Sequence, residues 1–214
     1  MSRIETLQRL SDSPVIAVIR MNDTSKLMNV IEALSDGGVK FIEITFTTPN
    51  AADIIKDISK KVPSDSIVGA GTVLDPETAR TAILAGAKFV VGPVLNLETI
   101  RLVHRYDIMM LPGAFTPTEI LTAWEYGADV VKVFPATELG PNFFKDIRGP
   151  LPQIRMLPTG GVSVDNAGEF IKNGAFAIAA GTDLLDKVAI ANNKFEIIAE
   201  KAKKIIANVK AAKK

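Results

Sequence analysis

The stretch Gly127-Ala128-Asp129-Val130-Val131 has three counterparts along the chain, and together they give the strongest indication of the fold. The counterparts are Gly38-Val39-Lys40-Phe41-Ile42, Gly86-Ala87-Lys88-Phe89-Val90 and Gly174-Ala175-Phe176-Ala177-Ile178. In each, a glycine follows a segment of helical periodicity and precedes an apolar run, and glycine suits the left-handed residue that closes a helix. The glycines lie 41 to 48 positions apart. This spacing fits two strand–helix units.

Apolar runs of strand length recur along the whole chain. They are Val15–Ile19, Phe41–Ile44, Ile67–Val68, Phe89–Val91, Ile108–Leu111, Val130–Phe134, Arg155–Leu157 and Ala177–Ala180. Helix-start signals lie between them: Asp75-Pro76 places a cap before a first-turn proline, and Thr116 with Glu119 forms a capping box. Near-continuous apolar strands that alternate with helices indicate a parallel sheet covered by helices.

Eight such units leave no block of sequence for a second domain. We therefore predict an α/β fold, a single (β/α)8 barrel (TIM barrel) domain over residues 1–214, with an N-terminal helix. An open doubly wound sheet is the alternative. It is disfavoured because no Gly-x-Gly-x-x-Gly fingerprint follows the first apolar run.

Composition narrows the classes of function. The 214 residues include 25 Lys and Arg against 24 Asp and Glu, so a basic field for nucleic acid is missing. The chain has no cysteine, which excludes disulfides, iron–sulfur clusters and thiol nucleophiles. The start, Met1–Ser11, is polar, and no apolar run approaches the ~20 residues that span a membrane. We expect a cytoplasmic protein without nucleic-acid or membrane partners, its lysine-rich end a solvated helix.

The repeat also predicts which side chains point into the barrel. Residues two apart share a face of a strand, and alternate strands supply the side chains of one layer. The fifth residues after the aligned glycines are Glu43, Val91, Lys132 and Ala179, and the seventh are Thr45, Pro93, Phe134 and Gly181. An acid and an amine are therefore expected to reach inward from opposite strands.

Lys132 stands out because it lies inside Val130–Pro135, a run that should be buried. Desolvation lowers the pKa of an amine and makes it nucleophilic toward a ketone. A nearby carboxylate, Glu43, would move the protons that such chemistry needs. The alternative is a structural ion pair between Lys132 and Glu43, which is costly to desolvate and stabilises little.

The expected strand ends supply candidate ligand sites. Pro158–Ser163 and Ala180–Asp183 follow the last two strands, where loops of this architecture commonly hold phosphate on backbone N–H groups. Asp183 would put a negative charge beside that phosphate. Arg20 ends the first strand and is a candidate clamp for a carboxylate. Gly69–Thr72 offers small residues and a hydroxyl, which suits close approach of a ligand.

These motifs resemble the 2-keto-3-deoxy-6-phosphogluconate (KDPG) aldolases, a family in which several members also cleave 4-hydroxy-2-oxoglutarate. The resemblance extends from Val15–Arg20 to Gly181. Its strongest segments are Ile42–Thr45, Val68–Val73, Val131–Ala136 and Leu157–Val162.

The resemblance implies a role for each matching position. Lys132 matches the Schiff-base lysine and Glu43 the general acid/base. The substrate-binding positions implied are Arg20, Thr45, Thr72, Pro93, Phe134 and Thr159, and the phosphate-binding positions are Gly160, Gly161, Gly181 and Thr182. Other members carry an arginine where this chain has Thr47, so Arg20 is expected to take its place.

The implied reaction needs neither metal nor cofactor. Neutral Lys132 attacks the C2 ketone of a small 2-keto acid and forms an iminium. Glu43, through water, takes the C4 hydroxyl proton as the C3–C4 bond breaks, and the products are glyceraldehyde 3-phosphate and pyruvate. A metal aldolase is disfavoured because the one histidine, His104, falls on a predicted outer helix and is expected at the surface.

Several alternatives stay open at this point. The substrate can be the phosphogalactonate isomer or 4-hydroxy-2-oxoglutarate. A phosphosugar isomerase or epimerase of similar shape would need no covalent lysine. A non-catalytic oligomeric barrel would lock Lys132 and Glu43 as a structural pair. A homotrimer is implied by the resemblance alone.

Overall fold

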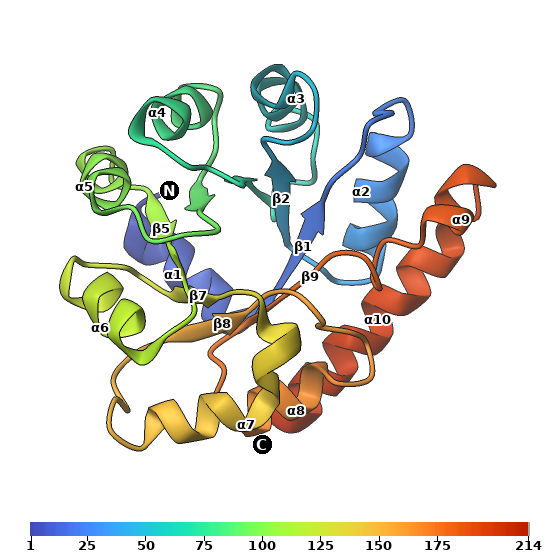
Figure 1. Cartoon of the computed structure of the whole chain (residues 1–214). Helices are drawn as coiled ribbons and strands as arrows, with labels where there is room; N and C mark the ends of the chain where they lie inside the picture. Colours follow the sequence, from blue (N-terminus) through green and yellow to red (C-terminus); the bar gives the residue numbers. More distant parts are fainter. Residues whose placement is uncertain (214) are drawn as a thin grey trace.

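A computed structural model describes residues 1–213 and arranges them as an α/β fold with parallel strands inside and helices outside (Figure 1). Six strands form a curled sheet in the order β5-β4-β3-β2-β1-β9, and three form a second sheet in the order β6-β7-β8. The first sheet contains β1 (Val15–Ile19), β2 (Phe41–Thr45), β3 (Ile67–Gly71), β4 (Phe89–Val91), β5 (Met109–Leu111) and β9 (Ile178–Ala180). The second contains β6 (Gly113–Ala114), β7 (Val131–Val133) and β8 (Met156–Pro158).

Helices surround the strands, as Figure 1 shows. They are α1 (Arg3–Asp12), α2 (Leu27–Asp36), α3 (Ala51–Ile58), α4 (Pro76–Leu84), α5 (Leu97–Arg105), α6 (Pro117–Glu125), α7 (Ala136–Arg148), α8 (Ala167–Lys172), α9 (Lys187–Ala191) and α10 (Phe195–Ala212). No helix within residues 1–213 combines the length and the apolar character that crossing a membrane requires. The expected solvated C-terminal helix is α10, and Lys214 lies outside the described residues.

The local signals in the sequence are confirmed. The repeated glycines Gly38, Gly86, Gly127 and Gly174 have φ values of 92°, 113°, 96° and 100°, which glycine adopts without the steric cost of a side chain. The expected capping box also forms, since the Thr116 side chain accepts from the Glu119 amide and the Glu119 side chain accepts from the Thr116 amide.

The fifth expected strand, Ile108–Leu111, is present as β5, and after Pro112 a short strand, β6, follows that the sequence did not predict. A proline has no N–H to donate, so a regular ladder cannot run through it. Its carbonyl nevertheless accepts from Lys132 N at 2.9 Å, and Met110 O accepts from Asp129 N at 3.1 Å. At the other edge of the second sheet, Thr159 and Ala179 form a parallel bridge. Backbone contacts therefore link the two sheets on both sides.

The strand order distinguishes between the two predicted topologies. Strands β1 to β5 follow one another in sequence, and the last strand, β9, pairs with the first. A doubly wound sheet reverses its order at a switch point instead. The doubly wound alternative is therefore wrong for this chain.

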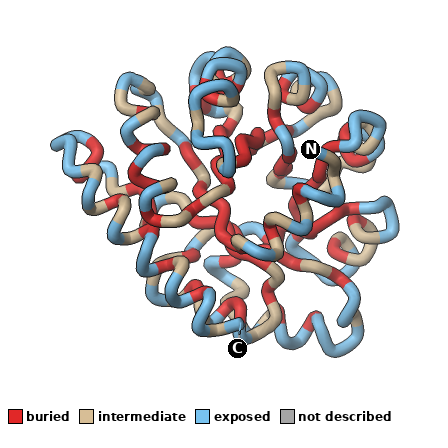
Figure 2. Tube along the Cα trace, turned by 180° about the vertical axis from the view of Figure 1, so that it is seen from behind, coloured by how far each residue is buried: buried red, intermediate tan, exposed pale blue. Residues whose placement is uncertain are grey.

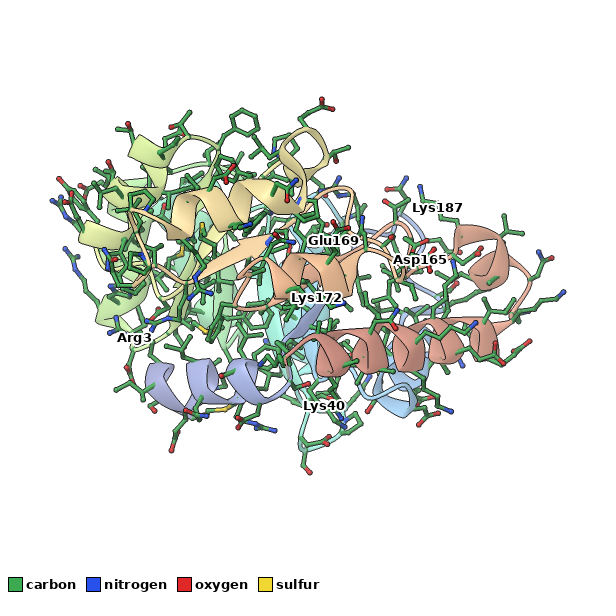
Figure 3. All side chains as sticks on the ribbon, turned by 90° about the horizontal axis from the view of Figure 1, so that it is seen from below. Arg3, Lys40, Asp165, Glu169, Lys172 and Lys187 are labelled. Carbon is green, nitrogen blue, oxygen red and sulfur yellow. The ribbon has the colours of Figure 1, made fainter. Side chains whose placement is uncertain are left out.

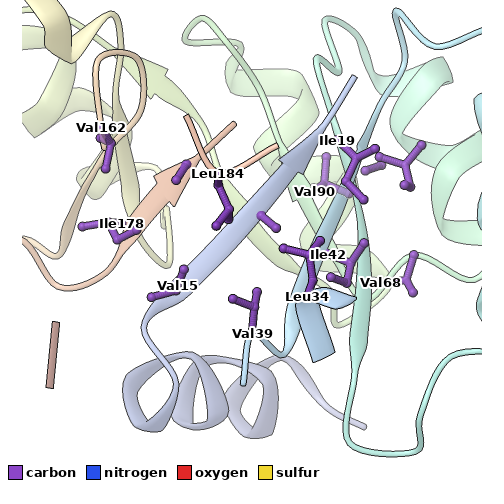
Figure 4. Packing of buried hydrophobic residues seen from close by; sticks show 14 of the residues in the cluster. Val15, Ile19, Leu34, Val39, Ile42, Val68, Val90, Val162, Ile178 and Leu184 are labelled. Carbon is purple, nitrogen blue, oxygen red and sulfur yellow. The ribbon is translucent and has the colours of Figure 1, made fainter. Parts of the chain in front are cut away.

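Buried apolar side chains form two clusters on opposite faces of the strands. The larger lies between strands and outer helices and includes Ile42, Val68, Val90 and Ile178 (Figure 4). The smaller lies on the inner face; its buried members are Leu10, Ile16, Phe41, Ile67, Phe89, Val91, Met109, Leu111, Val130, Leu157, Ala177 and Ala179. Figure 2 shows buried residues in the middle of the molecule and exposed ones on the outer turns.

Helix α1 closes one end of the inner cluster, because its Leu10 is fully buried there. Arg3 of the same helix (Figure 3) reaches the buried Asp129 at 3.4 Å. His104 lies on α5 as expected, but it is not a surface residue. Its side chain is 20% exposed and its Nε2 is 3.5 Å from Asp129 Oδ2, because α5 packs against β5, whose Met110 amide also donates to Asp129.

Candidate active site

Glu43 and Lys132 both project from the inner face of the strands. Glu43 lies two residues after Phe41 and Lys132 two after Val130, and both apolar residues belong to the inner cluster. The side chains are buried, with Glu43 1% and Lys132 5% exposed. The expected inward acid and amine are therefore present, and Val91 and Ala179 line the same interior.

The buried environment controls the charge of Lys132. Burial lowers the pKa of its amine, Glu43 opposes this shift with its negative charge, and Arg20 adds to it with a positive one. The ammonium group also lies 4.9 Å from the centre of the Phe134 ring. Within residues 1–213, Lys132 forms no direct ion pair with Glu43 or another acid. A locked pair, the structural alternative, would require one.

The pKa of Glu43 is shifted in the opposite direction to that of Lys132. Burial raises the pKa of its carboxyl group, against the opposing pull of Lys132 and Arg20. Its Oε2 atom is buried without a hydrogen-bond partner. Unsatisfied buried polar atoms are costly, so this one is available to a water or a substrate hydroxyl. A lowered amine pKa favours nucleophilic attack, and a raised carboxyl pKa suits a group that exchanges a proton with its ligand.

The small residues of β3 make room for this arrangement. A Cβ atom on Gly71 would collide with the carboxylate of Glu43, and one on Gly69 would collide with the ring of Phe89. The sequence suggested that Gly69–Thr72 lets a ligand approach. For Gly69 and Gly71 this was wrong, because the vacant side-chain positions are filled by the protein's own interior.

A cavity of about 1110 Å³ lies at the carboxyl ends of β1, β8 and β9. Of the sequence-predicted positions, its lining includes Arg20, Phe134, Thr159, Gly160, Gly161, Gly181 and Thr182. The predicted positions Glu43, Thr45, Thr72, Pro93 and Lys132 do not line it. Phe134 links the two groups, because it lines the cavity and also contacts the Lys132 amine.

The end of β2 carries a cluster of hydroxyl groups. Thr45 is fully buried, and its Oγ1 lies 3.0 Å from Thr47 Oγ1 and 3.4 Å from Thr48 Oγ1. Thr72 follows β3 with a φ of 57°, a strained value for a residue with a side chain. Thr159 also has a buried Oγ1 without a partner, and it lines the cavity.

Some backbone N–H groups of the loop after β8 already donate hydrogen bonds within the protein, which the sequence did not suggest. The amide of Ser163 donates to Asn166 Oδ1 and that of Val164 to Asp183 Oδ2, each at 2.8 Å. These N–H groups therefore cannot serve an anion, and the donors expected there are confined to the glycine segment. Gly160 and Gly161 have φ values of 88° and 71°. Asp183 directs a carboxylate oxygen at the neighbouring loop.

Sequence reasoning missed the basic residues at the far end of the cavity. They are Lys26, Lys187 and Lys201, and all three line the cavity. Lys26 precedes the first residue of α2, Lys187 begins α9, and Lys201 lies on α10. Lysines on helices are ordinarily solvated, so the sequence held no signal for them. Among residues 1–213, no three histidine or acidic side chains gather to hold a metal ion.

We expect Gly71→Ala to lower the free energy of unfolding by about 1–3 kcal/mol, because the added methyl group overpacks against Glu43. Introducing Glu43→Ala into this variant should recover most of the loss, since the colliding carboxylate is gone. Gly69→Ala is the matched control: it collides with Phe89, so Glu43→Ala should not rescue it. Urea unfolding of the four variants measures these effects, and equal losses with and without Glu43 would contradict the contact.

Comparison with known proteins gives a consistent result. The family model described as KDPG and KHG aldolase matches residues 6–201. The 2-dehydro-3-deoxy-phosphogluconate aldolase of Pseudomonas aeruginosa is 36% identical over 190 residues, which cover 88% of this chain and 85% of that protein.

Two solved structures extend the similarity to three dimensions. A KDPG aldolase from Legionella pneumophila, with pyruvate captured as a covalent carbinolamine intermediate, is 28% identical with a TM-score of 0.86, over 93% of this chain and 97% of that one. A native KDPGal structure is 30% identical with a TM-score of 0.85, over 93% and 95%. Because the family model spans most of the sequence, this chain belongs to the KDPG and KHG aldolase family.

Proposed function

We propose that this protein is a Schiff-base aldolase that cleaves KDPG to pyruvate and glyceraldehyde 3-phosphate, with Lys132 as its nucleophile. The observation that carries the proposal is the buried amine of Lys132, whose pKa is lowered by burial on the inner face that also holds Glu43. Membership of the aldolase family supports it. So does the related Legionella enzyme, in which pyruvate forms a covalent carbinolamine.

The proposed reaction begins at Lys132 Nζ. Its lone pair attacks the C2 ketone, and loss of water from the carbinolamine gives an iminium. Glu43, through a water molecule, then takes the proton of the C4 hydroxyl as the aldehyde forms and the C3–C4 electron pair moves into the iminium. The resulting enamine takes a proton at C3, and water hydrolyses the new iminium to pyruvate and free Lys132. The raised pKa of Glu43 suits a group that must both accept and return this proton.

The cavity supplies some of the proposed binding positions, and the strand ends near Glu43 and Lys132 supply the others. Arg20, exposed at the end of β1, would bind the substrate carboxylate by charge-assisted hydrogen bonds. The remaining substrate contacts are assigned to Thr45, Thr72, Pro93, Phe134 and Thr159, and the phosphate contacts to Gly160, Gly161, Gly181 and Thr182. Thr159 offers an unpartnered hydroxyl beside the cavity, which supports its assignment.

We further propose that the strands close into a (β/α)8 barrel and that residues 1–214 form one domain. The pairing of β9 with β1 and the backbone links at both edges of the second sheet support closure. The homotrimer and the cytoplasmic location stay predictions that rest on the resemblance and the composition.

Borohydride reduction in the presence of pyruvate should leave a covalent adduct on Lys132, identified by mass spectrometry of the digested protein. Lys132→Met should form no adduct and lose cleavage by roughly 10³-fold or more, because the nucleophile is gone. It should remain folded, since an apolar side chain suits the buried site. Lys88→Met, at an exposed lysine, is the control and should behave as wild type. An adduct elsewhere, or undiminished cleavage by Lys132→Met, would refute the assignment.

Arg20→Gln should raise KM about tenfold for KDPG, for its galactonate isomer and for 4-hydroxy-2-oxoglutarate, because all three share the 2-keto carboxylate. Arg105→Gln, an exposed arginine on α5, is the matched control. Wild-type kcat/KM for the three compounds then separates the candidate substrates. The galactonate isomer is the second candidate, favoured by the similarity to the KDPGal structure. An unchanged KM in Arg20→Gln would contradict the proposed carboxylate site.

A further inference from the structure

The loops after β8 and β9 are tied together by side chains that are not among the assigned phosphate positions. Asp183, in the β9 loop, accepts a hydrogen bond from the Val164 amide in the β8 loop at 2.8 Å through its Oδ2 atom. The two loops together carry the four assigned phosphate positions. Their separation therefore depends on this contact.

Helix α10 holds the same two loops from outside. Lys201 Nζ donates to the Asp183 carbonyl at 2.8 Å and lies 3.4 Å from Asp186 Oδ2. Asn208 Nδ2 donates to the Val164 carbonyl at 2.8 Å. Lys201 and Asn208 are seven residues apart, so they share one face of the helix. Figure 3 shows α10 lying alongside α8, the helix that follows the β8 loop.

We infer that Asp183, Lys201 and Asn208 form a clamp that fixes the spacing of the two loops and thereby sets the affinity for the phosphorylated end of the substrate. Asp183 and Val164 are the points where loop meets loop, and α10 holds one backbone carbonyl on each. The three are positioning residues and not direct ligands. The inference rests on the proposed function, because it takes phosphate to bind between these loops.

The clamp explains an acidic residue beside an expected phosphate. A carboxylate facing the phosphate would weaken binding by like-charge repulsion. Here one carboxylate oxygen is engaged by a backbone N–H, and the Lys201 ammonium holds the backbone carbonyl of the same residue. An asparagine could accept the same hydrogen bond through its carbonyl oxygen without the charge. Asp183→Asn therefore removes the charge and keeps the hydrogen bond, whereas Asp183→Ala removes both.

Steady-state kinetics with KDPG test the clamp. Asp183→Ala should raise KM about tenfold, which corresponds to about 1.4 kcal/mol, while Asp183→Asn stays near wild type. Asn208→Ala should raise KM in the same direction, and Lys203→Met, an exposed lysine of α10, should have no effect. The rate of pyruvate adduct formation should be unchanged in every variant, because pyruvate carries no phosphate. Thermal unfolding of each variant checks that it is folded.

Three results would overturn the inference. If Asp183→Ala and Asp183→Asn both lower KM, the carboxylate repels phosphate and does not position the loops. If neither variant changes KM, the clamp has no role. If pyruvate adduct formation slows by the same factor as KM for KDPG rises, the effect is not specific to the phosphorylated end of the substrate.

Failure of the proposed function is a separate outcome. It would appear as a wild-type protein that forms no pyruvate adduct. Stabilisation of wild type and Asp183→Ala by inorganic phosphate, measured as a shift in Tm, then tests the clamp without catalysis. Wild type should be stabilised more than Asp183→Ala, and equal shifts would refute the clamp.

Discussion

A buried amine, that of Lys132, which has no direct counter-ion among residues 1–213, is the feature on which the rest of the structure depends. Burial of Lys132 disfavours its charged form, and Glu43 on the same inner face is shifted toward its own neutral form. A direct ion pair would have kept both groups charged. The separation of the two side chains therefore keeps each available for reaction, and the surrounding apolar interior disfavours the charged form of both.

The rest of the fold serves this arrangement. Gly71 leaves space for the Glu43 carboxylate, and Phe134 contacts the Lys132 amine and also lines the cavity. Helix α1 covers the opposite end of the interior with Leu10, and the cavity lies at the carboxyl ends of β1, β8 and β9. The proposed function thus places the chemistry on strands, and it places the recognition of the distal part of the ligand on loops that α10 contacts.

Much of this could be predicted from local sequence patterns. The repeated glycines gave the strand–helix period, and counting residues from them placed Glu43 and Lys132 on one face, because strand periodicity is fixed at two. Features that depend on distant partners were out of reach. Tertiary packing produces four such features. Glu43 fills the space beside Gly71, and the strands are interrupted at Pro112. His104 is partly buried, and Lys201 contacts the β9 loop. Asp183 is an example. Its place in the sequence put a negative charge beside the expected phosphate, and only the structure shows that its carboxylate accepts a hydrogen bond from the Val164 amide.

Titration of the Lys132 amine by NMR, with ¹⁵N-labelled lysine and Lys132→Met to identify the signal, probes the electrostatics on which the account rests. The pKa of Lys132 should lie below that of an exposed lysine. Removing the positive charge in Arg20→Gln should raise this pKa, and removing the negative charge in Glu43→Gln should lower it further. A Lys132 amine that titrates like an exposed lysine, or above it, would mean that it is held as a charged structural group, and the account would be wrong.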